Sequence, residues 1–244
     1  PTDKKVWCPT FPDFQKPLLQ NWGQNRTFLK NIVPYSRPKS PSPYDENPQS
    51  NFYKLAKEVY TTVKNITPEQ LVIAKYWSDD AGILGGTPPA HSISITTQIL
   101  QKENAGLGMA AETYAKVGIG ISDAFVSCWH YKYQFNHLRP ITYIRNLIDP
   151  QFLPPLSTPP FPEYTSGHSV QTGATARILS DIFGYNYAFS DNTHIKRTDI
   201  EGKPRKFKSF FAMANEAAMS RLYGGIHYRE AIENGMTQGI RIGE

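Results

Sequence analysis

The 244-residue sequence has only two cysteines, Cys8 and Cys128, and no apolar run as long as a bilayer is thick. The spacing of the cysteines leaves open either one disulfide bond or two unrelated thiols. The most apolar stretch, residues 114–129, is interrupted by Lys116 and Asp123, whereas a spanning helix needs about 20 apolar residues. We therefore expect no membrane span.

The sequence also lacks a concentrated block of positive charge. Its formal net charge is +5, and its densest basic spots are Lys4 with Lys5 and the group Lys203, Arg205, Lys206 and Lys208. A solvated surface explains such short clusters better than a nucleic-acid groove, so we expect no nucleic-acid partner. The composition, with 39% hydrophobic and 19% charged residues, excludes disorder for most of the chain.

The two ends of the sequence differ from its middle. It starts at Pro1 without a methionine and stops at Glu244 inside an expected helix, so we expect segments to be missing at one or both ends. Many of the 20 prolines fall in the first 50 residues, where no regular periodicity is visible. This pattern predicts an extended, proline-rich N-terminal arm over residues 1–50 and a helical domain over residues 51–244.

Helical spacing of apolar residues dominates after residue 50, without a run of alternating strands or an internal repeat. The predicted helices cover residues 51–63, 68–77, 93–100, 106–136, 140–147, 170–183 and 210–223, and a last helix starts near Tyr228. We expect a loop or small hairpin over residues 190–208. The predicted fold class is all-α, a helical bundle.

Three separated patches carry polar residues suited to one anion. Lys132 and Arg139 lie seven positions apart, close to two helical turns, so both can face one side of the chain. Residues 165–168 read Thr-Ser-Gly-His at a loop-to-helix junction, where free N–H groups attract anions. A second arginine and a second histidine, Arg221 and His227, flank a glycine pair. Together these residues predict a site for a tetrahedral, phosphate-like oxyanion.

The order and spacing of these patches resemble the superfamily of type 2 phosphatidic acid phosphatases, bacterial class A acid phosphatases and vanadium-dependent haloperoxidases. The resemblance covers residues 75–231, and the bacterial iodoperoxidases and bromoperoxidases resemble the chain best. Trp129 and Phe161 stand where similar haloperoxidases line an apolar halide pocket. The segment around Asp80 resembles the haloperoxidase segment whose aspartate pairs with an active-site arginine, here Arg221.

Two positions depart from the family pattern. Thr165 stands where the motif usually begins with proline, and Ala231 stands where an aspartate usually orients the last histidine. Glu230 is one position short of that aspartate. Either Glu230, a main-chain carbonyl or a water molecule therefore takes over the orientation of His227.

The resemblance implies an enzyme of the haloperoxidase / acid phosphatase fold that uses vanadate as its cofactor and hydrogen peroxide and halide as its substrates. His227 would bind the metal, and His168 would hydrogen-bond the apical oxygen and take up a proton. The catalytic residues would be His168, Lys132 and His227. The implied vanadate-binding residues are Lys132, Arg139, Ser166, Gly167, His168 and Arg221.

Iodide is the expected halide because it is the easiest to oxidise; bromide is possible and chloride is not expected. Phe161, where many bromoperoxidases have histidine, also argues for iodide. The resemblance leaves two alternatives: a phosphate monoester hydrolase in which His227 forms a phosphohistidine and His168 protonates the leaving oxygen, and a helical binding domain without activity. We expect a secreted or periplasmic location.

Overall fold

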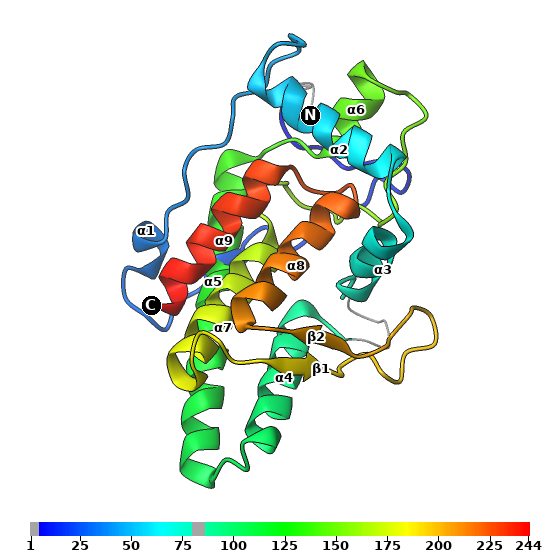
Figure 1. The fold of residues 1–244 in the computed structure, drawn as a ribbon. Helices are drawn as coiled ribbons and strands as arrows, with labels where there is room; N and C mark the ends of the chain where they lie inside the picture. The colour runs from blue at the N-terminus through cyan, green and yellow to red at the C-terminus, as the bar shows by residue number, and fades with distance from the viewer. Residues whose placement is uncertain (1–4, 80–85) are drawn as a thin grey trace.

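The computed structural model describes residues 5–79 and 86–244, which fold as a helical bundle with one small hairpin (Figure 1). This confirms the predicted all-α class. The helices are α1 (Ile32–Tyr35), α2 (Asn51–Lys64), α3 (Pro68–Tyr76), α4 (Pro88–Lys102), α5 (Leu107–Phe135), α6 (Pro140–Leu147), α7 (Gly167–Phe183), α8 (Phe210–Tyr223) and α9 (Arg229–Gly243). A 3-10 turn, η1 (Trp22–Gln24), and the strands β1 (Phe189–Asp191) and β2 (Arg205–Phe207) complete the described elements.

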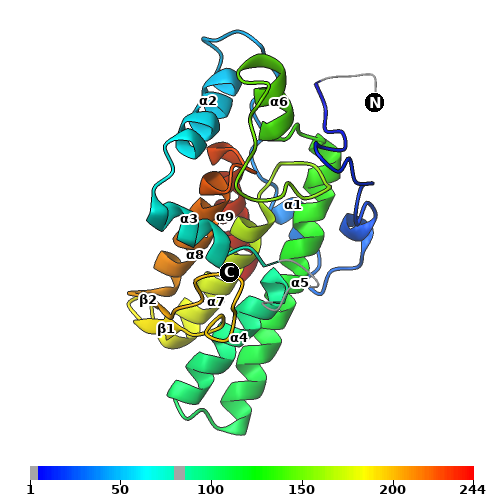
Figure 2. The same ribbon diagram turned by 90° about the vertical axis from the view of Figure 1, so that its right-hand side faces the viewer.

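Helix α7 lies at the centre of the bundle, and α5, α8 and α9 pack around it (Figures 1 and 2). Most of its residues from Ser169 to Ser180 are buried. Helices α7 and α9 approach closely because Gly239 has no side chain: a Cβ there would lie 2.0 Å from the carbonyl oxygen of Val170. The small residue therefore fixes how near the two helices come.

The long helix α5 carries the chain to one end of the bundle. It runs antiparallel to α4 and ends where Asn136 adopts a left-handed conformation with φ 48°. The chain then turns at Arg139, the N-cap of α6 (Figure 2). This turn places the end of α5 and the start of α6 beside the start of α7.

Helices α4 and α7 and the segment after α7 differ from the sequence prediction. Helix α7 begins at Gly167, before the predicted residue 170, because the Ser166 hydroxyl accepts the main-chain N–H of Ser169. Helix α4 begins at Pro88, before the predicted residue 93, because the Thr87 hydroxyl accepts the main-chain N–H of Ala90 and proline fits the first helical position. The polar segment after α7 forms the hairpin β1–β2, in which Phe189 pairs with Phe207. Both phenylalanines are buried, so the hairpin joins the core.

The N-terminal arm lies along α5. The Asp123 carboxylate accepts the main-chain N–H groups of Phe28 and Leu29, each at 2.8 Å. Cys8 and Cys128 are separate free thiols, which decides between the two alternatives left open by their spacing. Among the residues described, none of the helices combines the length and the apolar composition that a bilayer crossing needs.

Candidate active site

The three predicted patches meet where α5 and α8 end and α7 begins. Lys132 lies in the last turn of α5, and Arg221 lies in the last turn of α8. The Nη1 of Arg139 is 3.2 Å from the Nε2 of His227, which joins the first patch to the third. The charge of Arg221, in the third patch, acts on His168 in the second patch. The fold therefore gathers residues that lie up to 95 positions apart in one buried site.

Lys132 and Arg139 are held in place by one loop. The Nζ of Lys132 donates to the carbonyl oxygens of Pro162 and Glu163, each at 2.9 Å. The Nε of Arg139 donates to the carbonyl oxygen of Phe161 at 2.9 Å. Both cations are completely buried. Since a carbonyl carries no net charge, these contacts orient the two cations without neutralising them.

Burial changes the acidity of both cations. It lowers the pKa of Lys132 to about 7, and the nearby charge of Arg139 lowers it further. It also lowers the pKa of Arg139 to about 10, against the attraction of Glu163. The Nη2 of Arg139 is buried without a hydrogen-bond partner in the described part of the chain. A buried cation of this kind is stabilised by a counter-charge, so the pair is suited to an anion.

The start of α7 offers further donors. Ser166 is the N-cap residue, and its hydroxyl oxygen accepts the main-chain N–H of Ser169 at 3.4 Å. Gly167 and His168 are the first two residues of the helix. The N–H groups of a first helical turn have no acceptor within the helix, and the helix dipole favours negative charge there. This junction is therefore a second feature that attracts an oxyanion.

His168 is a neutral imidazole with a free ring nitrogen. Its Nε2 is buried and has no hydrogen-bond partner among the residues that the structure describes. Burial holds the pKa of His168 well below its ordinary value, and the charge of Arg221 adds to this effect, while Asp79 opposes it. A neutral histidine with an available nitrogen can accept a proton from a ligand bound beside it.

His227 is oriented by Glu163, a residue that sequence reasoning missed. The Oε1 of Glu163 lies 2.8 Å from the Nδ1 of His227 and accepts the main-chain N–H of Tyr228 at 3.0 Å. The other oxygen lies 3.1 Å from the Nδ1 of His137. Burial alone would raise the pKa of Glu163, but the hydrogen bonds from the two histidines outweigh it and hold the pKa below the ordinary range.

The surroundings of His227 also determine its protonation state and tautomer. Burial lowers its pKa to about 3, and the charge of Arg139 acts in the same direction, while Glu163 opposes both. The imidazole is therefore neutral at pH 7. Its Nδ1–H points to Glu163, so the Nε2 lone pair faces the site, where it accepts the Nη1–H of Arg139 at 3.2 Å and is the nitrogen that could bind a metal in place of that hydrogen bond.

Glu230, one of the three substitutes considered for the missing aspartate, contacts Ser42 of the N-terminal arm. Its carboxylate accepts the main-chain N–H of Ser42 at 2.9 Å and the Ser42 hydroxyl at 3.2 Å, so it ties the arm to α9. The proposal that Glu230 orients His227 is wrong. One signal in the sequence could have pointed to Glu163: it is the single carboxylate between Asp149 and Asp181.

Arg221 is anchored to the end of α3. Its Nη2 donates to the carbonyl oxygens of Ala74 at 3.2 Å and Trp77 at 2.8 Å, and its Nε donates to the Ser220 hydroxyl at 2.9 Å. The predicted pairing with Asp80 falls outside the described residues. The charge of Arg221 acts on the His168 imidazole, so the two side chains lie near each other.

The two predicted halide-pocket residues lie together next to the cations. The rings of Trp129 and Phe161 are 5.0 Å apart. The Lys132 Nζ lies 5.8 Å from the Trp129 ring and 5.2 Å from the Phe161 ring, and the Arg139 guanidinium lies 5.1 Å from Phe161. The site is therefore bounded on one side by aromatic, weakly polar surface.

Comparison with known proteins gives one family. A family model described as the VCPO second helical-bundle domain matches residues 147–244. The vanadium chloroperoxidase of Curvularia inaequalis is 26% identical over 220 residues, which is 67% of this chain and 36% of that protein.

Similar solved structures carry vanadium-dependent haloperoxidase names as well, and they match more of this chain than the family model does. A structure described as the first bacterial vanadium-dependent iodoperoxidase is 40% identical, with a TM-score of 0.93, and the match covers 100% of this chain and 60% of that one. A holo-type bacterial vanadium-dependent chloroperoxidase is 17% identical with a TM-score of 0.74, over 94% of this chain and 54% of that one, and supports the fold alone. The chain thus spans 60% or less of each of these proteins.

Proposed function

Because this chain belongs to the vanadium haloperoxidase family, we propose that it binds vanadate and oxidises halide with hydrogen peroxide to hypohalous acid. One observation carries the proposal: two completely buried cations, Lys132 and Arg139, lie beside buried nitrogens without partners, the Nη2 of Arg139 and the Nε2 of His168. A tetrahedral oxyanion supplies the negative charge and the acceptor oxygens that this arrangement lacks. The residues present therefore fit vanadate.

The residues divide into those that would hold the oxygens and one that would hold the metal. The proposed oxygen-binding residues are Lys132, Arg139, Arg221, Ser166 and Gly167, the last through its main-chain N–H. His227 would bind vanadium through Nε2, since Glu163 occupies its Nδ1. Bound vanadate supplies a Lewis acid that activates hydrogen peroxide toward attack by halide.

His168 is the proposed proton acceptor. Its Nε2 is buried and has no hydrogen-bond partner among the described residues, so it is available to accept a proton from hydrogen peroxide. Burial, and after it the positive charge of Arg221, keep the pKa of His168 low. A bound anion acts in the opposite direction and raises that pKa, which makes His168 a stronger base when the site is loaded.

We propose iodide as the preferred halide and bromide as a slower substrate. Iodide is more easily oxidised than bromide. It is also more polarisable, and this polarisability suits the aromatic surface formed by Trp129 and Phe161. The similar structure at 40% identity, described as an iodoperoxidase, supports the same choice. Chloride, which the relatives at lower identity are named for, is not proposed.

The test uses the purified chain, stripped of metal by dialysis against a chelator and then titrated with orthovanadate. Iodide and bromide oxidation are measured with hydrogen peroxide, and hydrolysis of an aryl phosphate is measured separately without vanadate. We expect iodide oxidation to rise with vanadate and to saturate. His130→Ala is the control, because His130 is an exposed histidine of α5.

The other outcomes decide between the alternatives. Phosphate release that vanadate inhibits, without halide oxidation, would mean that His227 acts as a nucleophile in a phosphatase. Oxyanion binding without either reaction would mean a helical binding domain. Either result contradicts the proposed haloperoxidase activity.

A further inference from the structure

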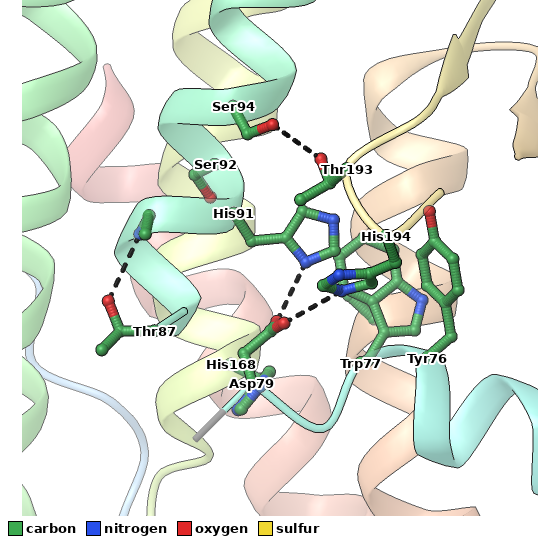
Figure 3. Close-up of polar contacts among 12 residues, drawn as sticks. Tyr76, Trp77, Asp79, Thr87, His91, Ser92, Ser94, His168, Thr193 and His194 are labelled. Carbon is green, nitrogen blue, oxygen red and sulfur yellow. Dashed lines mark hydrogen bonds and ion pairs between the residues drawn. The ribbon is translucent and has the colours of Figure 1, made fainter. Parts of the chain in front are cut away.

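A second buried cluster lies behind His168, outside the oxyanion site. Asp79 follows α3, His91 belongs to α4, and His194 follows β1; their exposed fractions are 3%, 1% and 0%. Figure 3 shows the polar atoms of these three side chains pointing toward one another, with His168 next to Asp79. We propose that Asp79, His91 and His194 bind a divalent transition-metal ion, with Zn²⁺ as the best-fitting member of that class.

The donor atoms already have the spacing of metal ligands. The Asp79 Oδ2 lies 2.9 Å from the His91 Nδ1, and the Asp79 Oδ1 lies 3.1 Å from the His194 Nε2. One ligand atom from each of the three residues lies within 4.8 Å of the others. Tetrahedral zinc with bonds of about 2.0–2.1 Å places neighbouring ligand atoms about 3.3 Å apart. A small adjustment of the side chains is enough to reach that geometry.

His194 is the observation that points to a ligand. Within residues 5–79 and 86–244, both of its ring nitrogens are buried without a hydrogen-bond partner, and so is the Asp79 Oδ1. The 3.1 Å approach between His194 and Asp79 therefore has the distance of an ion pair without the direction of a hydrogen bond. Buried polar groups are normally satisfied. A metal ion between the two side chains satisfies the imidazole and the carboxylate together.

One ring nitrogen of His91 contacts a carboxylate, as is usual for metal-binding histidines. Its Nε2 lies 2.8 Å from the Asp191 Oδ2, and Asp191 also accepts the Tyr76 hydroxyl and the main-chain N–H of Thr193, each at 2.9 Å. A carboxylate that accepts one ring N–H fixes the tautomer and leaves the other nitrogen to the metal. The Nδ1 of His91, which is hydrogen-bonded to the Asp79 Oδ2 at 2.9 Å, is the nitrogen that would exchange its proton for the metal ion.

Charge and packing agree with this assignment. Within the described residues, the ion pairs of Asp79 and Asp191 run only to His91 and His194, so a bound dication would replace the imidazole protons that otherwise balance the two buried carboxylates. The Trp77 ring stacks on His91 with centroids 4.6 Å apart and closes the cluster from solvent. The site would supply three protein ligands and leave the fourth tetrahedral position to a water molecule. It fixes Asp79 beside His168 and ties α4 to the hairpin.

The test measures metal and not halide chemistry, so it stays separate from the proposed function. The purified wild-type protein is stripped with a chelator, and Zn²⁺ alone is added without vanadate. We expect about one equivalent of zinc to be retained after dialysis, measured by mass spectrometry of the metal, and a rise in melting temperature with added zinc. His194→Phe, which keeps an aromatic ring but has no donor, should weaken zinc binding at least tenfold and abolish the rise.

His130→Ala is the matched control and should bind zinc like the wild type, because it removes an exposed histidine. Wild-type protein that retains no zinc and does not change in melting temperature overturns the proposal, as does equal zinc binding by His194→Phe. If His194→Phe fails to fold, the test is to add Co²⁺ to the stripped wild-type protein and to measure its visible absorption. The intense visible absorption of four-coordinate cobalt supports the site, and its absence contradicts it.

Discussion

At the scale of single residues, the Glu163 carboxylate determines how His227 can be used. It occupies the Nδ1 of His227 and also contacts His137 and the main chain of Tyr228. The local pattern around His227 indicated that an aspartate was missing but could not indicate its replacement. Glu163 lies 64 positions earlier, in a proline-rich loop without periodicity, so only the folded loop brings the two together.

Glu163→Gln should weaken vanadate binding about 10- to 100-fold, the usual effect of losing the carboxylate behind a metal-binding histidine. The reason is that glutamine is uncharged and orients His227 less strongly. The measurement is a vanadate titration that follows the recovery of iodide oxidation. Glu230→Gln is the control and should retain wild-type affinity, because Glu230 contacts Ser42. Equal affinity in both variants would remove Glu163 from its assigned role.

Alanine substitutions of His227 and His168 should affect vanadate retention and turnover differently. His227→Ala should abolish vanadate retention, since it removes the proposed metal ligand. His168→Ala should retain some vanadate but lose most turnover, since it removes only the proposed proton acceptor. Vanadium content after gel filtration and iodide oxidation by the same samples give the comparison. The assignment of roles is wrong if both variants retain the same amount of vanadium.

The lowered pKa of Lys132 predicts proton uptake on anion binding. With a pKa of about 7 in the anion-free protein, Lys132 is mostly neutral at pH 8 and mostly charged at pH 6. A bound anion raises that pKa, so binding should take up a proton at pH 8 and much less at pH 6. Sulfate is the probe, because it does not titrate in this range, and calorimetry in buffers of different ionisation enthalpy measures the uptake. Lys132→Met should bind more weakly without proton uptake at pH 8; undiminished uptake in this variant would contradict the assignment.

At the scale of helices and strands, the contact between α7 and α9 depends on Gly239. Gly239→Ala should destabilise the protein by about 1–3 kcal/mol, because the new Cβ must push the two helices apart. Gly118→Ala in α5 is the matched control: no atom lies within 4 Å of its added Cβ. That change should stabilise the protein by about 0.5–1 kcal/mol. Urea unfolding of both variants gives the free energies, and a neutral Gly239→Ala would show that the helices can separate freely.

Periodicity predicted most helices of the described chain because their buried faces follow the helical repeat. It did so best for α5, α6 and α8, whose predicted bounds agree with the observed ones to within a residue or so. It failed at the start of α4, where the first turn is specified by the Thr87 cap and two prolines and not by apolar residues. It left the hairpin open, because strands of three residues are too short to show an alternation.

At the scale of the whole molecule, the arm is attached to the bundle through Asp123. Asp123→Asn should release part of that attachment, since the amide offers one acceptor oxygen for the two N–H groups of Phe28 and Leu29. We expect both amides to exchange hydrogen with solvent about tenfold faster or more, measured by mass spectrometry. Asp181→Asn, an exposed change on α7, should leave their exchange unaltered. Unchanged exchange in Asp123→Asn would mean that other contacts hold the arm.

The division at residue 50 and the secreted or periplasmic location stay predictions, and the chain spans 60% of the length of the similar iodoperoxidase structure. The three patches that meet in the site belong to the described chain, so the proposed vanadate binding can be tested on this chain as it stands.

The contacts of Lys132 and Arg139 with the carbonyl oxygens of residues 161–163 have a consequence for how this protein can evolve. The loop that carries Glu163 is positioned by the same two cations that would hold the oxyanion. Substitutions in the loop and at the cations should therefore be strongly non-additive. Mutations that look neutral in one background will be harmful in another, and the two segments are expected to change together or not at all.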